Sequence, residues 1–132
     1  MSREIRIPGP DHPIEVRRNP NRLRVTAKDG GEVIADTTAA LTLSEADYPP
    51  VDYLPLADVD QNLLARTDSH TYCPYKGEAS YYSLVTAGKE IADAVWVYER
   101  PHAAVPEIAG HVAFYPQYVE TTVAESEQDR GD

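Results

Sequence analysis

Apolar and polar residues alternate along much of the chain, a pattern typical of β-strands with one buried face. The clearest example is LRVTAKD, in which Leu23, Val25 and Ala27 lie on one side and polar residues on the other. The glycines of DGG follow, and the next segment, EVIADT, is again strand-like. Because glycine tolerates the positive φ angles of a tight turn, the two segments predict a β-hairpin.

Similar segments continue along the chain. IEVRR and ALTL predict short strands near the N-terminus. EASYYSLVT, the turn AGKE and IADAVWVYE predict a second hairpin, and Pro116 separates two more strands, GHVAFYP and QYVETTV. VDYL, inside the proline-rich EADYPPVDYLPLADVD, predicts a short edge strand, because prolines are tolerated beside edge strands.

One segment favours a helix. In ADVDQNLLAR, Asp58 or Asp60 would cap the first turn, and Val59, Leu63 and Leu64 would share one face. The predicted architecture is therefore mainly β: a single small, twisted two-sheet or barrel-like domain of about seven to eight short strands with one short helix. This domain would span residues 1–123. The acidic end, residues 124–132, predicts a solvated, disordered tail.

Composition narrows the function classes. The chain has 132 residues and a formal net charge of −10, and such an acidic protein repels the phosphate backbone, so we expect no nucleic-acid partner. No apolar run is long enough to span a membrane, and the N-terminal segment lacks the apolar core of a signal peptide. The single cysteine cannot form an internal disulfide. We therefore expect a soluble, cytoplasmic protein.

The densest chemistry lies in SHTYCPYKGEASYYS, residues 69–83. Cys73 is a candidate nucleophile or redox thiol, with His70 three residues before it as a candidate base and Lys76 three residues after it. The alternative is that Cys73 is a small buried apolar residue, which is the more common role of a single cysteine.

Metal and phosphate chemistry are weaker interpretations of the same stretch. HTYC offers one His and one Cys, but no second close pair completes a zinc site, so we predict no metal and no cofactor. In PYKG, Lys76 and Gly77 offer a charge and a close backbone approach to a phosphate, yet no P-loop or GxGxxG pattern accompanies them. A proline–glycine turn with an exposed lysine is the favoured alternative.

The second hairpin relates this stretch to the only tryptophan. A turn centred on Gly88 would place Ser80 opposite Trp96, and directly opposed residues share one face of an antiparallel pair. Glu78 would then lie opposite Tyr98, which shares a face with Trp96. A shift of one residue would turn Trp96 to the other face.

The convergence of these residues has two interpretations: a packed aromatic core, or a pocket with an aromatic wall. In the pocket, Trp96 and Tyr98 form the wall, and the remaining ligand-binding candidates lie at its lip or beside it: Tyr72, Cys73, Tyr75, Lys76, Ser80 and Tyr82.

Asp93 is a further candidate, because it interrupts the apolar strand IADAVWVY. A buried carboxylate needs a partner, and Arg66, Lys76 or a backbone group could supply one. The alternative is an acid on an edge strand that faces water.

Several segments also resemble a known family. GEVIADT, YPPVDYLPLADV, LLARTDSHTYCPYKGEASYYSL, IADAVWVYERP and IAGHVAFYP follow one another as in the domain of unknown function four-two-seven family, sometimes labelled a nucleotidyltransferase. The resemblance covers about residues 14–123. It implies a tent-like all-β fold similar to the methionine sulfoxide reductase B and Mss-four groups.

The resemblance does not carry over every property of those groups. Their zinc is held by two cysteine pairs, which this chain lacks, and the paired aspartates of nucleotidyltransferases after a Gly-Ser turn are absent from the sequence. By analogy of fold alone, tent-like domains use an aromatic-lined pocket for small cyclic ligands.

Three hypotheses follow. The leading one is a domain that binds a small molecule in the aromatic-walled pocket. The second is an enzyme that uses Cys73 with His70 as base. The third is an interaction module without catalysis, which would bind a partner by strand addition near YPPVDYLP.

Overall fold

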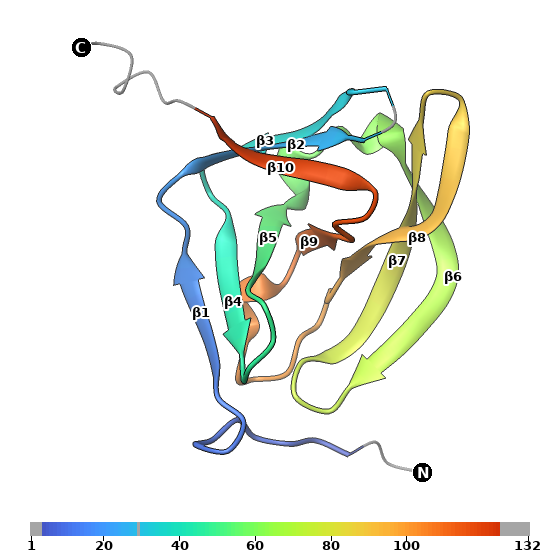
Figure 1. The fold of residues 1–132 in the computed structure, drawn as a ribbon. Helices are drawn as coiled ribbons and strands as arrows, with labels where there is room; N and C mark the ends of the chain where they lie inside the picture. Colours follow the sequence, from blue (N-terminus) through green and yellow to red (C-terminus); the bar gives the residue numbers. More distant parts are fainter. Residues whose placement is uncertain (1–3, 29, 125–132) are drawn as a thin grey trace, which may run out of the picture.

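The computed structural model describes residues 4–28 and 30–124, and this part of the chain forms a mainly β domain of two sheets (Figure 1). The predicted two-sheet β architecture is therefore confirmed. Its ten strands are β1 (Ile14–Arg18), β2 (Arg22–Ala27), β3 (Val33–Thr37), β4 (Leu41–Glu45), β5 (Val51–Pro55), β6 (Leu64–Cys73), β7 (Gly77–Thr86), β8 (Lys89–Val97), β9 (His111–Phe114) and β10 (Val119–Ala124).

The larger sheet has seven strands in the order β1-β4-β5-β9-β8-β7-β6, and the smaller has three in the order β10-β2-β3. Every strand pair is antiparallel. In Figure 1 the smaller sheet crosses the upper part of the larger sheet. Strands β1 and β4 form one side of the larger sheet, and β6 and β7 form the opposite side. Such crossing buries one face of each sheet, which is how a small β domain obtains a core.

Two clusters of buried side chains result. The first cluster lies between the sheets and draws on strands of both, with Val25 and Ile34 from the smaller sheet and Leu54, Leu84 and Val95 from the larger. The second cluster lies on the other face of the larger sheet and is rich in tyrosine. Its buried members are Leu43, Tyr53, Ala79, Tyr81, Tyr98, Val105, Ile108 and Ala113. Alternation along β5 illustrates the division, since Tyr53 joins the second cluster and Leu54 the first.

The predicted helix in residues 57–66 is wrong. The segment forms two short 3-10 turns, Leu56–Asp58 and Gln61–Leu63, and the chain then enters β6. Asp60 does cap the second turn, because its side chain accepts a hydrogen bond from the backbone N–H of Asn62. Leu64 instead pairs with Leu84 across β6 and β7. Sheet pairing thus prevails over a short helix, whose first turn is costly to nucleate.

The predicted edge strand at VDYL is also wrong, because β5 lies inside the larger sheet between β4 and β9. The outermost strands of that sheet are β1 and β6. In the described part of the chain, no helix is long and apolar enough to cross a membrane. The predicted acidic tail lies outside the described residues, apart from Ala124 at the end of β10.

The second hairpin forms as predicted, but its register differs. Ala87 and Gly88 have φ angles of 49° and 74°, and two positive φ angles are typical of the tight turn that joins paired strands. Close to the turn Thr86 pairs with Lys89, whereas beyond Leu84 the register shifts. Trp96 therefore pairs with Tyr81 and not, as predicted, with Ser80.

Candidate functional site

Two β-bulges face each other across β7, and the turn of the second hairpin determines which face Trp96 occupies. In β8, the residues between Ile91 and Val95 oppose a single residue of β7, and in β6 the residues between Arg66 and His70 are likewise irregular. At each bulge three residues oppose a single residue of β7, and an insertion of two residues leaves the following side chains on the same face. The turn itself shifts the register by one residue, because Thr86 pairs with Lys89 and not with Glu90, as a turn centred on Gly88 would require. Trp96 consequently shares a face with Tyr81 and belongs to the second cluster.

Asp93 links the two bulges. It has a φ angle of 55°, in the left-handed region that aspartate tolerates better than most residues. Thr67 Oγ1 donates a hydrogen bond to Asp93 Oδ1 at 2.7 Å, and Ser69 Oγ donates to Oδ2 at 2.6 Å. These hydrogen bonds lower the pKa of Asp93. The partners of Asp93 are therefore two hydroxyl groups and not, as expected, Arg66, Lys76 or a backbone group.

Trp96 lines a hollow of about 380 Å³, here called the tryptophan hollow. Strands β5 and β9 pair only through Leu54–Val112 and Pro55–His111, and beyond these pairs they diverge. The hollow lies where they separate, and its walls are mostly apolar. The lining residues are Tyr48, Pro49, Pro50, Val51, Asp52, Leu54, Trp96, Phe114, Pro116 and Thr121.

Two tyrosines, Tyr53 and Tyr115, hold the indole of Trp96 in place. Its Nε1–H donates a hydrogen bond to the Tyr53 hydroxyl at 3.2 Å, and the two rings meet edge to face. On its flank, the ring of Tyr115 lies 4.6 Å away between centroids. Tyr53 is 1% exposed, whereas Trp96 is only partly buried. Trp96 is therefore held rigidly while part of its ring remains open to the hollow.

Tyr98, the other predicted wall residue, lies deeper. It is 7% exposed, and its ring packs against Tyr53 at a centroid distance of 6.5 Å. Burial raises the pKa of Tyr98. Tyr98 supports the wall from within the second cluster and is not among the residues that line the tryptophan hollow.

The turn from Cys73 to Lys76, predicted as the lip of the pocket, is closed by ion pairs. Lys76 Nζ lies 2.7 Å from Glu45 Oε1, and His12 Nε2 lies 2.7 Å from Glu45 Oε2. The side chains of Lys76 and Glu45 are only 15% and 13% exposed. Burial is the largest single influence and lowers the pKa of Lys76, but the hydrogen bond to Glu45 and the neighbouring charges together raise the pKa above its ordinary value. Lys76 is thus already paired with the carboxylate of Glu45 and is not arranged to bind phosphate.

Neighbouring segments cover the rest of this turn. The ring of Tyr75 stacks on His12 at 4.0 Å, and Tyr72 donates a hydrogen bond to the carbonyl of Glu4. At Gly77, which has a φ angle of 112°, a Cβ atom would lie 3.3 Å from His102. The glycine therefore permits a close approach of two protein segments. The turn is a packed closure between the N-terminal segment and the chain after β8.

Cys73 and His70 are not brought together. In the regular part of β6 they are three residues apart, so their side chains lie on opposite faces of the strand. Cys73 is partly buried and packs against the second cluster, near enough to Lys76 to interact with it electrostatically. His70 faces the other side of the sheet. The predicted nucleophile–base pair is therefore not assembled.

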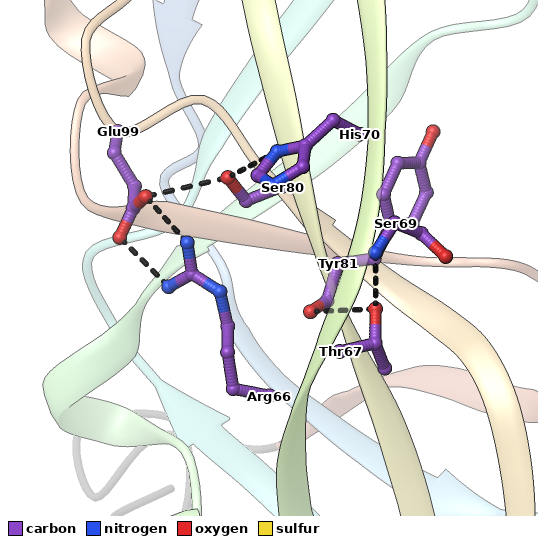
Figure 2. Close-up of polar contacts among 7 residues, drawn as sticks. All are labelled: Arg66, Thr67, Ser69, His70, Ser80, Tyr81 and Glu99. Atoms are coloured by element: carbon purple, nitrogen blue, oxygen red, sulfur yellow. Dashed lines mark hydrogen bonds and ion pairs between the residues drawn. The ribbon is translucent and has the colours of Figure 1, made fainter.

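Figure 2 shows what His70 contacts instead. Ser80 Oγ lies 3.4 Å from His70 Nδ1 and donates a hydrogen bond to Glu99 Oε1 at 3.3 Å. Glu99 forms a two-pronged ion pair with Arg66, which lies over the ring of Tyr82. In a catalytic triad the acid would orient the histidine, whereas here Glu99 bonds to the serine and the arginine. Ser80 and Tyr82 thus lie on the face opposite Trp96.

The structure also adds residues that the sequence analysis missed. Tyr53 orients Trp96, Tyr115 covers its flank, and Phe114 with the Tyr48–Pro50 segment completes the hollow. The proline cluster is the sequence feature that points to the Tyr48–Pro50 segment, but the third hypothesis treats this cluster as a surface for binding a protein partner. Within residues 4–28 and 30–124, no three His, Cys, Asp or Glu side chains cluster closely enough to hold a metal ion.

The family described as Domain of unknown function (DUF427) matches residues 15–125, which include every strand except the first residue of β1. No curated protein matches the chain. The match covers most of the sequence and both sheets. The chain therefore belongs to the DUF427 family.

Proposed function

We propose that this domain binds a small, flat, largely apolar molecule in the tryptophan hollow. The observation that carries the proposal is the partly open indole of Trp96, which stands in a wall of aromatic and proline side chains around about 380 Å³. Ligand sites are usually concave and mostly apolar, with a few polar groups that orient the ligand. An aromatic ligand would stack on the indole or meet it edge to face.

The preorganisation of the wall supports this role. Tyr53 and Tyr115 hold Trp96 before any ligand arrives, so little side-chain freedom is lost on binding. Asp52 lies at the rim, and its carboxylate accepts a hydrogen bond from Thr42 at 2.6 Å. It therefore offers a fixed acceptor for one polar group of the ligand. The remaining lining is adapted to shape and stacking, which favours binding over chemistry.

The alternative of a cysteine-dependent enzyme gains no support from this geometry, because Cys73 lies in the closed turn and His70 faces away from it. Strand addition at YPPVDYLP is disfavoured for a similar reason, since β5 already has a neighbour on each side. The proline segment contributes to the hollow instead.

Indole and nicotinamide are suitable first probes, because Trp96 is the only tryptophan and its fluorescence reports directly on the hollow. We expect at least one of them to quench or shift the emission in a saturable way and to raise the melting temperature. Tyr48→Ala should weaken that binding by roughly fivefold, because an aromatic contact typically contributes about 1 kcal/mol.

Tyr48 is 65% exposed, so its substitution should leave the fold intact. Val33→Ala is the matched control, since Val33 is 48% exposed, lies in β3 and does not line the hollow. If a broad set of flat heterocycles leaves the emission of Trp96 unchanged, or if both variants bind like the wild type, the proposal is wrong.

A further inference from the structure

A second hollow, of about 520 Å³, lies beside the two bulges and is here called the bulge hollow. Its lining combines one carboxylate with aromatic and hydroxyl side chains. The lining residues are Ser69, His70, Thr71, Tyr81, Asp93, Tyr115, Gln117 and Tyr118. The proposed function places no ligand in this hollow, which shares no lining residue with the tryptophan hollow; Tyr115 lines this hollow and flanks Trp96 from outside the other.

The position of Asp93 is unusual for a strand residue. A left-handed backbone conformation is costly for any residue other than glycine, and it persists only where the surroundings enforce it. Here the bulge in β8 and the hydroxyls of Thr67 and Ser69 hold the carboxylate in one orientation. Figure 2 shows Thr67, Ser69 and Tyr81 together on one side of β6 and β7, opposite the side that carries Arg66 and Glu99.

The carboxylate forms no ion pair with a cation of the described residues. Its two oxygens accept one hydroxyl hydrogen bond each, which leaves lone pairs for a further donor. None of the described residues that line the hollow is a lysine or an arginine. By contrast, Asp36, Glu45 and Glu99 each form an ion pair with a lysine or arginine. The hydroxyl donors also keep Asp93 in its charged form, because they lower its pKa.

Three tyrosines complete the surroundings. Tyr81, Tyr115 and Tyr118 line the same hollow, and the Tyr81 hydroxyl is fixed by a 2.8 Å hydrogen bond with Thr71 Oγ1. Tyrosine faces carry partial negative charge and attract cations. A charged acid held among aromatic rings is the combination that recognises organic ammonium groups.

We infer that the bulge hollow is a binding site for a small organic cation, with the ammonium group paired to Asp93 and its alkyl part against Tyr81, Tyr115 and Tyr118. A neutral polyol would also find hydrogen-bond partners here, but it would leave the charge of Asp93 uncompensated. The inference stands independently of ligand binding in the tryptophan hollow.

Matched pairs of probes isolate the contribution of charge. Choline is compared with its neutral isostere 3,3-dimethylbutan-1-ol, and butylamine with butan-1-ol, by NMR titration of the aromatic signals. We expect at least one cation to bind roughly tenfold more tightly than its neutral counterpart, as cation–π and ion pairing predict. The signals of Tyr81, Tyr115 and Tyr118 should move most, and Trp96 should respond only through its contact with Tyr115.

Asp93→Asn tests the acid itself. Asparagine tolerates the left-handed conformation as aspartate does, so the bulge should be preserved while the charge is lost. We expect the preference for cations to disappear in this variant while the neutral probes bind as before. Glu99→Gln is the matched control, because it removes the same charge from the opposite face of the sheet and should retain the preference.

Three outcomes would overturn the inference. The first is equal binding of cation and neutral isostere to the wild type. The second is a preference for cations that survives Asp93→Asn, and the third is the absence of any cation binding when the NMR spectrum shows a folded protein.

Discussion

The turn from Cys73 to Lys76 and the tryptophan hollow each combine aromatic, proline and charged residues, yet they are organised in opposite ways. In the turn, the charged and aromatic groups satisfy one another: Lys76 with Glu45, and Tyr75 with His12. In the hollow, Trp96 has a hydrogen-bond partner at its Nε1–H and is only partly buried. Reactive residue types therefore mark a binding site only where some of their surface is left without a protein partner.

The origin of the difference is topological. The turn is covered by the N-terminal segment, whose backbone reaches it through the bond from Arg6 N–H to the carbonyl of Pro74. The hollow exists because β5 and β9 diverge after only two pairs. Substitutions in the turn should consequently affect the free energy of unfolding, whereas substitutions at the hollow should mainly affect binding.

The largest effect is expected from Glu45→Gln. This change leaves the Lys76 ammonium without its anion in a site where it is 15% exposed, which should lower the free energy of unfolding by about 3 kcal/mol. Urea denaturation measures the loss. Glu15→Gln is the control, since its ion pair with Arg17 is exposed and should contribute less than about 1 kcal/mol. Equal effects of the two variants would contradict the assignment of the turn as a closure.

The same pair predicts a pH dependence. Burial is the largest single influence and raises the pKa of Glu45, but the hydrogen bonds and charges of Lys76 and His12 together hold the pKa below its ordinary value of 4.5. A depressed carboxyl pKa stabilises the fold above the unfolded-state pKa, and this stabilisation is lost as the pH falls through the folded-state pKa. The difference in unfolding free energy between wild type and Glu45→Gln should therefore be constant near neutral pH and should narrow below pH 4.5.

A smaller loss is expected from Gly77→Ala. The new Cβ would lie 3.3 Å from the ring of His102 and 3.4 Å from the carbonyl of Arg100, at a φ angle that residues with a side chain rarely adopt. Strain of this kind typically costs about 2 kcal/mol, which thermal or urea unfolding would detect. Gly9→Ala is the matched control, because a Cβ added there would meet no atom within 4 Å and its φ is not positive. A neutral Gly77→Ala would mean that the close approach does not constrain the turn.

Much of the fold could be predicted from the sequence because it is encoded in local alternation. LRVTAKD and EVIADT do form the hairpin of β2 and β3, and EASYYSLVT does pair with IADAVWVYE. The helix failed since Leu64 has a β partner in Leu84, which no local pattern shows. Tertiary pairing prevailed over propensity there.

The site was predictable only in part, and the register of the second hairpin explains why. Trp96 lines a hollow, but a turn centred on Gly88 predicts it on the face of Ser80. The observed turn pairs Thr86 with Lys89 and so shifts the register by one residue, which directs Ser80 and Tyr82 away from Trp96. The polar Asp93 within an apolar strand marks the bulge in β8. Tyr53 and Tyr115 are distant in the chain, and only the folded sheet brings them to the indole.

The smallest effect is expected from Tyr53→Phe, because Tyr53 lies in the core and contacts Trp96 at the hollow. It removes the acceptor for Trp96 Nε1–H without changing the size of the ring, and an unpaired buried donor typically costs about 1 kcal/mol. Because Tyr53 is 1% exposed, no water can replace its hydroxyl without rearrangement. We expect a shifted emission of Trp96 and weaker binding of the indole or nicotinamide probe, together with this modest loss of stability.

Tyr72→Phe, in the closed turn, is the comparison for Tyr53→Phe. It should cost a similar amount of stability through its lost bond to Glu4 while leaving probe binding unchanged. If both variants weakened the probe equally, the closed turn and the open hollow would form one coupled unit rather than two independent regions.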